Sequence, residues 1–127
     1  MADSFQLAGS WSASPASGSP SGIANFCAPI SEALSLTKKD YDTISLTADA
    51  ASVVNFGSGV TEAQVVIIQA VGGKIRVRLT SADGATQAIP VDGTLILISR
   101  TVPITAIDLT RTTGITTTVD VFLGQTT

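Results

Sequence analysis

Short apolar runs alternate with polar and turn-forming residues along most of the chain. Where leucine or isoleucine occupies every second position, with serine or threonine between, the pattern is that of a strand with one buried face. No stretch shows a sustained helical period, so the pattern predicts an all-β protein of about eight strands. The runs that indicate strands are 34–37, 43–47, 53–56, 64–71, 74–80, 88–91, 94–100, 104–109 and 116–123.

Turn-forming residues separate these runs. Gly72 and Gly73 are the only residues between two long runs, and they predict a tight hairpin, because glycine adopts the positive φ angles of such turns. SADG at 81–84 and the pair Asp92-Gly93 predict further turns. Pro90 interrupts a run and cannot donate to a ladder, so it predicts an edge strand or a strand end.

The chain of 127 residues has room for one domain. We expect a single antiparallel β-sandwich or jelly-roll-like domain over residues 31–127, preceded by an extended arm over residues 1–30 that is rich in Ser, Ala, Gly and Pro. Two large rings, Phe5 and Trp11, lie in this arm. They indicate either an arm that docks on a partner or a tail that is simply pliable.

Two of the predicted strands are apolar at both alternating sets of positions, in 64–71 (QVVIIQAV) and in 95–98 (LILI). One face of a sandwich strand ordinarily meets water, so the second apolar face must be covered by a loop, by the arm or by another subunit. We favour a subunit interface. Its predicted contact residues are Val66, Ile68, Ile96 and Ile98.

The composition also favours a chain that buries part of its surface against other subunits. Charged residues make up 13% of the chain, about half the usual share for a globular domain, and the mean hydropathy of +0.41 is high for a free monomer. The formal net charge of −3 argues against nucleic acid as the main ligand, since phosphate backbones are bound by clustered Lys and Arg. No segment approaches the roughly 20 apolar residues that span a bilayer, so we expect no membrane partner.

The chemistry-bearing residues do not assemble into a recognisable site. The chain has no histidine, which removes the usual general base and the commonest transition-metal ligand. Asp40 and Asp42 stand among lysines in KKDYD, which favours a solvated loop over a pair of catalytic carboxylates. Cys27 has no partner for an intrachain disulfide and is interpreted as a buried thiol. We therefore predict no enzyme activity, no cofactor and no metal.

The sharpest polar feature is a basic stripe, in which Lys74, Arg76 and Arg78 alternate with apolar residues. Strand periodicity places the three cations on one face. Such a stripe either keeps a strand from aggregating edge to edge, or forms a docking surface for an acidic partner.

The pliable start, the Thr/Val/Ile-rich β region without histidine and the closing segment ITAIDLTRTTGITTTVDVFLG (104–124) together resemble small virion structural proteins of tailed bacteriophages. They are most similar to capsid decoration, or cement, proteins. The resemblance implies a homotrimer that binds the major capsid protein and braces the shell against internal DNA pressure. It implies no catalytic residue, and it implies localisation on the virion after assembly in the cytoplasm of a host bacterium.

Two other functions remain open. A tail, baseplate or fibre β module would share this composition. A glycan-binding head would use exposed aromatic side chains, for which the chain offers Trp11 and Tyr41.

Overall fold

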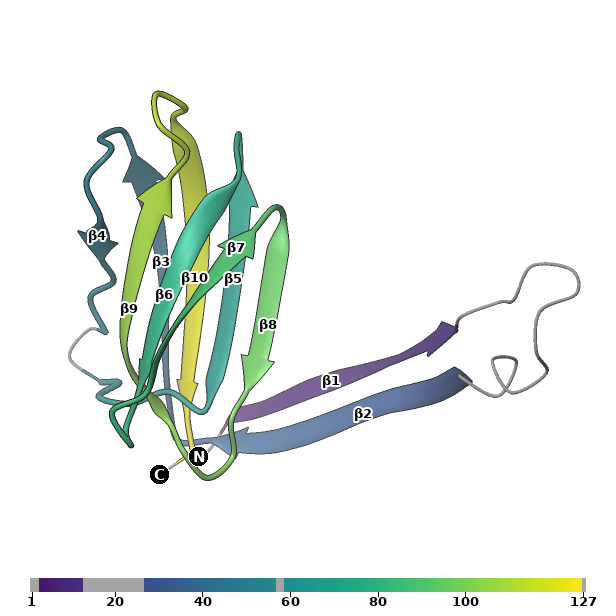
Figure 1. Cartoon of the computed structure of the whole chain (residues 1–127). Helices are drawn as coiled ribbons and strands as arrows, with labels where there is room; N and C mark the ends of the chain where they lie inside the picture. The colour runs from purple at the N-terminus through teal and green to yellow at the C-terminus, as the bar shows by residue number, and fades with distance from the viewer. Residues whose placement is uncertain (1–2, 13–26, 57–58, 127) are drawn as a thin grey trace, which may run out of the picture.

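The computed structural model describes residues 3–12, 27–56 and 59–126. Within these residues the chain forms ten strands in three antiparallel sheets (Figure 1). The strands are β1 (Asp3–Ser12), β2 (Cys27–Leu36), β3 (Lys38–Leu46), β4 (Ser52–Val53), β5 (Val65–Val71), β6 (Ile75–Ser81), β7 (Thr86–Val91), β8 (Thr94–Ile98), β9 (Ile104–Arg111) and β10 (Thr117–Gln125). No helix suited to crossing a membrane occurs in these ranges.

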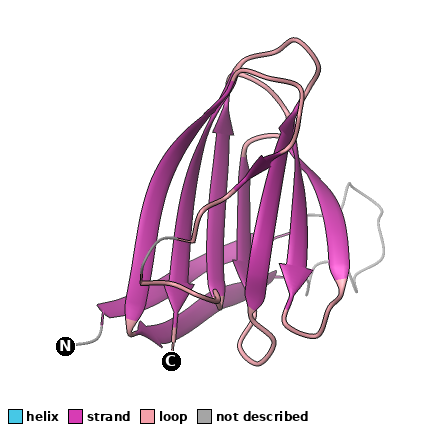
Figure 2. Ribbon diagram, turned by 90° about the vertical axis from the view of Figure 1, so that its left-hand side faces the viewer, coloured by secondary structure: helices cyan, strands magenta, loops and turns pink. Residues whose placement is uncertain are grey.

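Two sheets of four strands form a β-sandwich, which confirms the predicted fold class (Figures 1 and 2). One sheet has the order β3-β10-β5-β8, and the other has the order β4-β9-β6-β7. Of the connections between consecutive sandwich strands, that from β6 to β7 stays within one sheet, and the others cross to the opposite sheet. This connectivity is that of a jelly roll.

The predicted hairpin at Gly72 and Gly73 is wrong. Strand β5 pairs with β10 and β8, whereas β6 pairs with β9 and β7, so the glycine pair carries the chain from one sheet to the other. Facing sheets lie about 10 Å apart, a gap that two residues can bridge. A Gly-Gly pair therefore indicates a tight reversal of the chain without specifying that the two flanking strands share hydrogen bonds.

The close approach of β10 explains why glycine occupies this crossing. Gly72 has φ +105°, and a Cβ atom there would lie 3.0 Å from the backbone carbonyl oxygen of Thr116. A Cβ atom at Gly73 would lie 2.8 Å from side-chain atoms of Ile115 and Thr117. Side chains at these two positions would push the sheets apart at this end.

The core fills the space between the sheets with aliphatic side chains. The longer sandwich strands contribute inward-facing residues to it, and β8 packs the half-buried Leu95 and Leu97 against it. The buried members are Leu46, Val54, Val60, Ala63, Val66, Ile68, Ile75, Val77, Leu79, Val91, Ile104, Ile107, Leu109, Val119, Val121 and Leu123.

Two predictions about turns and edges are confirmed. The segment SADG joins β6 to β7 as a hairpin, in which the Gly84 backbone N–H donates to the Ser81 carbonyl at 2.9 Å. Pro90 lies in β7, which is an edge strand of its sheet.

The N-terminal region contains an antiparallel ribbon of two strands, β1 and β2, which pair from Asp3–Leu36 to Ser12–Cys27. The ribbon leaves the base of the sandwich and extends away from both of its sheets (Figure 1). Strand β2 runs through the boundary predicted at residue 30, and the alternating residues of 34–36 end this strand rather than forming one of the sandwich. The sandwich begins at Lys38.

The Gly72→Ala variant is expected to lower the free energy of unfolding by about 1–3 kcal/mol, because alanine is strained at positive φ and its Cβ would press on a backbone oxygen. Chemical denaturation measures the change. The matched control is Gly59→Ala, where nothing lies within 4 Å of the added Cβ, and a change below about 0.5 kcal/mol is expected. Equal effects of the two substitutions would contradict the proposed role of the crossing.

Candidate functional site

The outer face of the sheet β3-β10-β5-β8 carries an apolar row that runs across all four strands. Its members lie directly opposite one another in the pairing register and therefore share a face. We call Tyr41, Phe122, Ile67 and Ile96 the apolar row. Tyr41 is 65% exposed and Ile96 is 43% exposed, and the two middle side chains are half-buried.

The next row toward the base of the sandwich holds Lys39, Gly124, Val65 and Ile98, and the chain itself covers part of it. Val65 is buried although it belongs to the outer set of positions on β5. Leu36, the last residue of the ribbon, is only 3% exposed, and its δ carbons lie 2.9 Å from where a Cβ of Gly124 would be. The absence of a side chain at Gly124 therefore makes room for Leu36 against the sheet.

A polar row bounds the apolar surface on its other side. Thr43, Asp120, Gln69 and Thr94 occupy successive strands in register. The Thr43 hydroxyl donates to Oδ1 of Asp120 at 2.8 Å. The apolar row is thus a narrow band bordered by polar residues, and the outer face as a whole is not apolar.

The distribution of exposed large hydrophobic side chains distinguishes the two outer faces. Five are exposed in the part of the chain that the structure describes, and Tyr41, Val71 and Ile96 lie on this one face. The other two are Val53, on β4, and Ile115, in the connection before β10. Large contiguous apolar patches on a folded domain are typical of surfaces that bind other macromolecules, which makes this face a candidate.

The predicted interface residues need one correction. Val66 and Ile68 are fully buried in the core, so their side chains cannot contact another subunit. Ile96 and Ile98 lie on the outer face, with Ile98 half-buried beside Val65, and their interface role stays a prediction. The sequence shows that 64–71 is apolar on both faces, but not which of its two alternating sets faces inward.

The apolar row also contains residues that the sequence did not single out for this surface. Ile67 faces outward on β5. The only sign of its role in the sequence is that both alternating sets of positions in this strand are apolar. Phe122 interrupts a threonine- and valine-rich run, and the ring of Tyr41 suggests, from sequence alone, only a platform for glycans. Their alignment depends on the pairing of β10 with both β3 and β5, which lie far apart in sequence.

The opposite sheet carries the basic stripe on its outer face. The side chains of Lys74, Arg76 and Arg78 are exposed, and the residues between them fill the core, as the alternation predicts. Arg78 lies opposite Asp108 in the register, so a carboxylate offsets its charge on the neighbouring strand. Lys74 and Arg76 therefore provide the positive charge at the end of the stripe.

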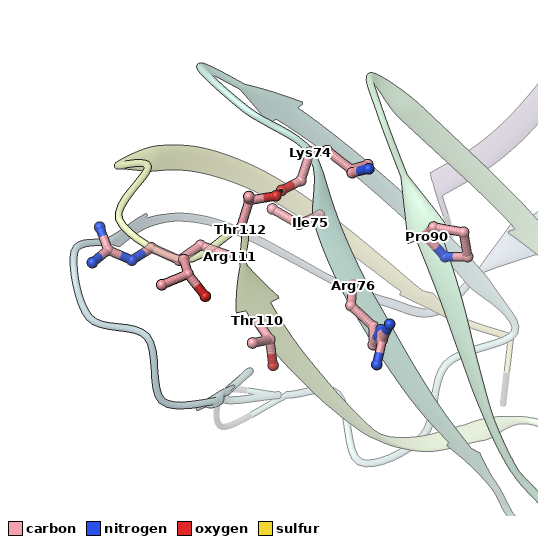
Figure 3. Close-up of a pocket in the computed structure, with 8 residues that line it drawn as sticks. Lys74, Ile75, Arg76, Pro90, Thr110, Arg111 and Thr112 are labelled. Carbon is pink, nitrogen blue, oxygen red and sulfur yellow. Dashed lines mark hydrogen bonds between the residues drawn. The ribbon is translucent and has the colours of Figure 1, made fainter.

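These two cations border a groove of about 450 Å³ between β6, β7 and β9 (Figure 3). Pro90 forms one wall, and Thr110 lies across from Arg76 in the register. The remaining lining residues are Ile75, Arg111, Thr112 and Thr113. The groove offers cationic and hydroxyl donors, which suit an acidic ligand.

A second groove, of about 290 Å³, opens between the two sheets beside β7 and β8. Its apolar lining comes from the inner faces of both sheets and includes Leu79, Ile89 and Leu97. Ser81, Asp83, Gln87 and Ser99 add polar groups to its lining.

Asp49 and Arg111 close the end of the sandwich beside the first groove. The backbone N–H of Gly114 donates to Oδ1 of Asp49 at 3.0 Å, and Nε of Arg111 donates to the same oxygen at 2.9 Å. These contacts, led by the one from Gly114, hold the pKa of the Asp49 carboxyl below its usual value. They also fix the connection between β9 and β10.

The remaining candidate residues do not form a common centre. No group of three or more His, Cys, Asp or Glu side chains suited to a metal ion occurs in residues 3–12, 27–56 and 59–126. Asp42 is exposed, and its Oδ1 accepts the backbone N–H of Thr43 at 2.9 Å. Phe5 and Trp11 lie in β1 and Cys27 begins β2, but their side chains are outside the described part of the structure.

Comparison of the chain with protein-family models, with curated proteins and with solved structures found no match.

The Asp49 carboxyl is expected to titrate below 3.8, its ordinary value. Because the folded state lowers this pKa, the group contributes stability above its unfolded pKa, and that contribution is lost as the pH falls through the folded pKa. The Arg111→Gln variant should raise the midpoint toward 3.8 without reaching it, since Gly114 still donates. Carboxyl-detected NMR titration measures both midpoints, and a wild-type midpoint at or above 3.8 would contradict the assignment.

Proposed function

We propose that the protein is a non-enzymatic structural protein of a bacteriophage virion, which self-associates and binds the capsid as a symmetric oligomer that stabilises the shell. The observation that carries this proposal is the contrast between the two outer faces of the jelly roll. One face presents the apolar row, and the other presents the basic stripe and its groove.

The apolar row supports self-association. Tyr41 and Ile96 lie at its two ends and are the more exposed of its side chains, so a flat partner surface would remove substantial apolar area from water. Burial of such area is the main favourable contribution to most protein association. The low content of charged residues agrees with a chain that hides part of its surface in an assembly.

The basic face supports attachment to a second, acidic surface. The chain as a whole has a net charge of −3, so the cations at Lys74 and Arg76 are a local departure from its overall sign. Local charge of this kind orients a subunit toward carboxylates on its partner. Each contact of one subunit is small, and a symmetric lattice of binding sites multiplies the effect through avidity.

The fold and the sequence resemblance support the viral setting. Jelly rolls occur in viral capsid proteins and also in lectins and cupins, so this support is an analogy of fold. The resemblance to decoration proteins adds the trimeric state and the major capsid protein as partner. An assembly of this kind needs two distinct surfaces on each subunit, one for its sister copies and one for the shell.

The Ile96→Asp variant is expected to weaken self-association by at least about tenfold, because an unpaired carboxylate buried at an interface costs several kcal/mol. Multi-angle light scattering over a range of concentrations measures the native mass. The matched control is Val53→Asp, since Val53 is 74% exposed on the opposite sheet. Its mass should equal that of the wild type. A wild-type protein that is monomeric at all concentrations would overturn the self-association.

The Arg76→Glu variant is expected to reduce attachment to the capsid by about tenfold, with the difference shrinking as salt is added. The measurement is co-sedimentation of the purified protein with phage particles assembled without it, followed by quantification of bound copies. Lys38→Glu makes the same change of charge on the other sheet and serves as the control. Failure of the wild-type protein to bind the particles would overturn the virion role.

A further inference from the structure

The ribbon of β1 and β2 is a two-stranded sheet that pairs with no strand of the sandwich within the described residues. It extends away from the sandwich, so most of its length lies against no other strand that the structure describes (Figure 1). An isolated two-stranded hairpin is marginally stable in water and needs a third element to pack against. The ribbon therefore needs a surface other than its own sandwich to pack against.

The register divides the ribbon into two unlike faces. Residues directly opposite in an antiparallel pair share a face, and alternate residues along a strand do so as well. By register, the positions of one face are the pairs Asp3–Leu36, Phe5–Leu34, Leu7–Glu32, Gly9–Ile30 and Trp11–Ala28. The other contains the pairs Ser4–Ser35, Gln6–Ala33, Ala8–Ser31, Ser10–Pro29 and Ser12–Cys27. The first set of positions includes the large apolar residues of the ribbon together with Asp3 and Glu32, and the second set includes small and uncharged polar residues. We call the first set the apolar face of the ribbon.

The apolar face of the ribbon continues the apolar surface of the sandwich. Leu36 belongs to the same alternating set as Leu34, and it packs against Gly124 on the outer face of the sheet β3-β10-β5-β8. Beyond this contact the ribbon departs from the sheet, and the apolar row is left partly exposed. Within the described residues, each chain thus presents a ribbon that pairs with no strand of the sandwich and an apolar row that is covered only in part.

We infer that the apolar face of the ribbon of one copy lies across the apolar row of a neighbouring copy, so that the subunits of the assembly exchange arms. This inference rests on the self-association in the proposed function and names the segment that makes the contact. Ten residues of strand extend about 33 Å, whereas four strands are about 15–20 Å wide. The ribbon is long enough to leave its own sandwich and cross the sheet of a neighbour.

Arm exchange also accounts for a closed assembly. Each copy donates one ribbon and accepts one, which is a heterologous contact, and such contacts close into a ring when the rotation between copies permits it. The apolar row is occupied once in every copy of the ring. A face-to-face dimer through two apolar rows would instead leave both ribbons without a surface.

Disulfide trapping between two single-cysteine variants tests the exchange. Both variants carry Cys27→Ser; one adds Glu32→Cys, on the apolar face of the ribbon, and the other adds Ile96→Cys, in the apolar row, with a tag that changes its size. After co-expression and mild oxidation, a non-reducing gel should show the mixed product of the two variants. No single chain can form it, because each has one cysteine.

Matched controls place the new cysteine on the wrong face. Ala33→Cys lies on the polar face of the ribbon, and Ala88→Cys is exposed on the opposite sheet. Mixed products at least about tenfold weaker with either control are expected. Products that join two copies of the Ile96→Cys variant would show face-to-face pairing and overturn the inference, as would equal trapping by the controls.

A second measurement separates this inference from the proposed function. The full-length variant with Phe5→Ser and Trp11→Ser should lose the oligomeric mass of the wild type in light scattering while keeping its circular dichroism spectrum. Gln6→Ala, on the other face of the ribbon, is the control and should keep the mass. An oligomer that persists in the double variant overturns arm exchange and leaves self-association standing. If the trapped oligomer forms but fails to bind phage particles, the result supports arm exchange and contradicts the proposed virion role.

Discussion

A strand sends alternate side chains to opposite sides, and this constraint governs the whole structure. Because the two sheets share one interior, half of each sandwich strand must face away from it. The core satisfies the inner half with aliphatic side chains such as Val77, Ile107 and Val121, which are nearly inaccessible to solvent. The outward-facing side chains do not have to fill the core, and the two sheets carry different kinds of residue at these positions. One is banded by apolar side chains and the other by cations.

The sequence predicted the β class, most strands of the sandwich and the basic face, because each depends on residues close together in the chain. Alternation in KIRVRLT leaves a single sensible arrangement, with the cations outward and Ile75, Val77 and Leu79 inward. Pro90 could be assigned to an edge because its missing donor is a property of the residue itself.

The apolar row could not be predicted in the same way. In QVVIIQAV both alternating sets are apolar, so local pattern does not decide between Val66 and Ile67 as the inward residue. The decision comes from β10, which lies beside β5 in the sheet and brings Phe122 level with Ile67. The hairpin predicted at Gly72 failed for a related reason, since turn chemistry describes the bend and says nothing about the partners of the strands that it joins.

The central position of β10 in its sheet affects how the chain folds while it is being synthesised. Strand β10 separates β3 from β5, so this sheet is incomplete until the last of the described strands has left the ribosome. Pairings between distant segments of this kind form slowly compared with local ones. The apolar strands β5 and β8 are synthesised before that partner and are exposed during the interval, when they can aggregate. High-level expression at reduced temperature, or in the presence of chaperones that hold apolar segments, therefore suits this chain better than rapid synthesis.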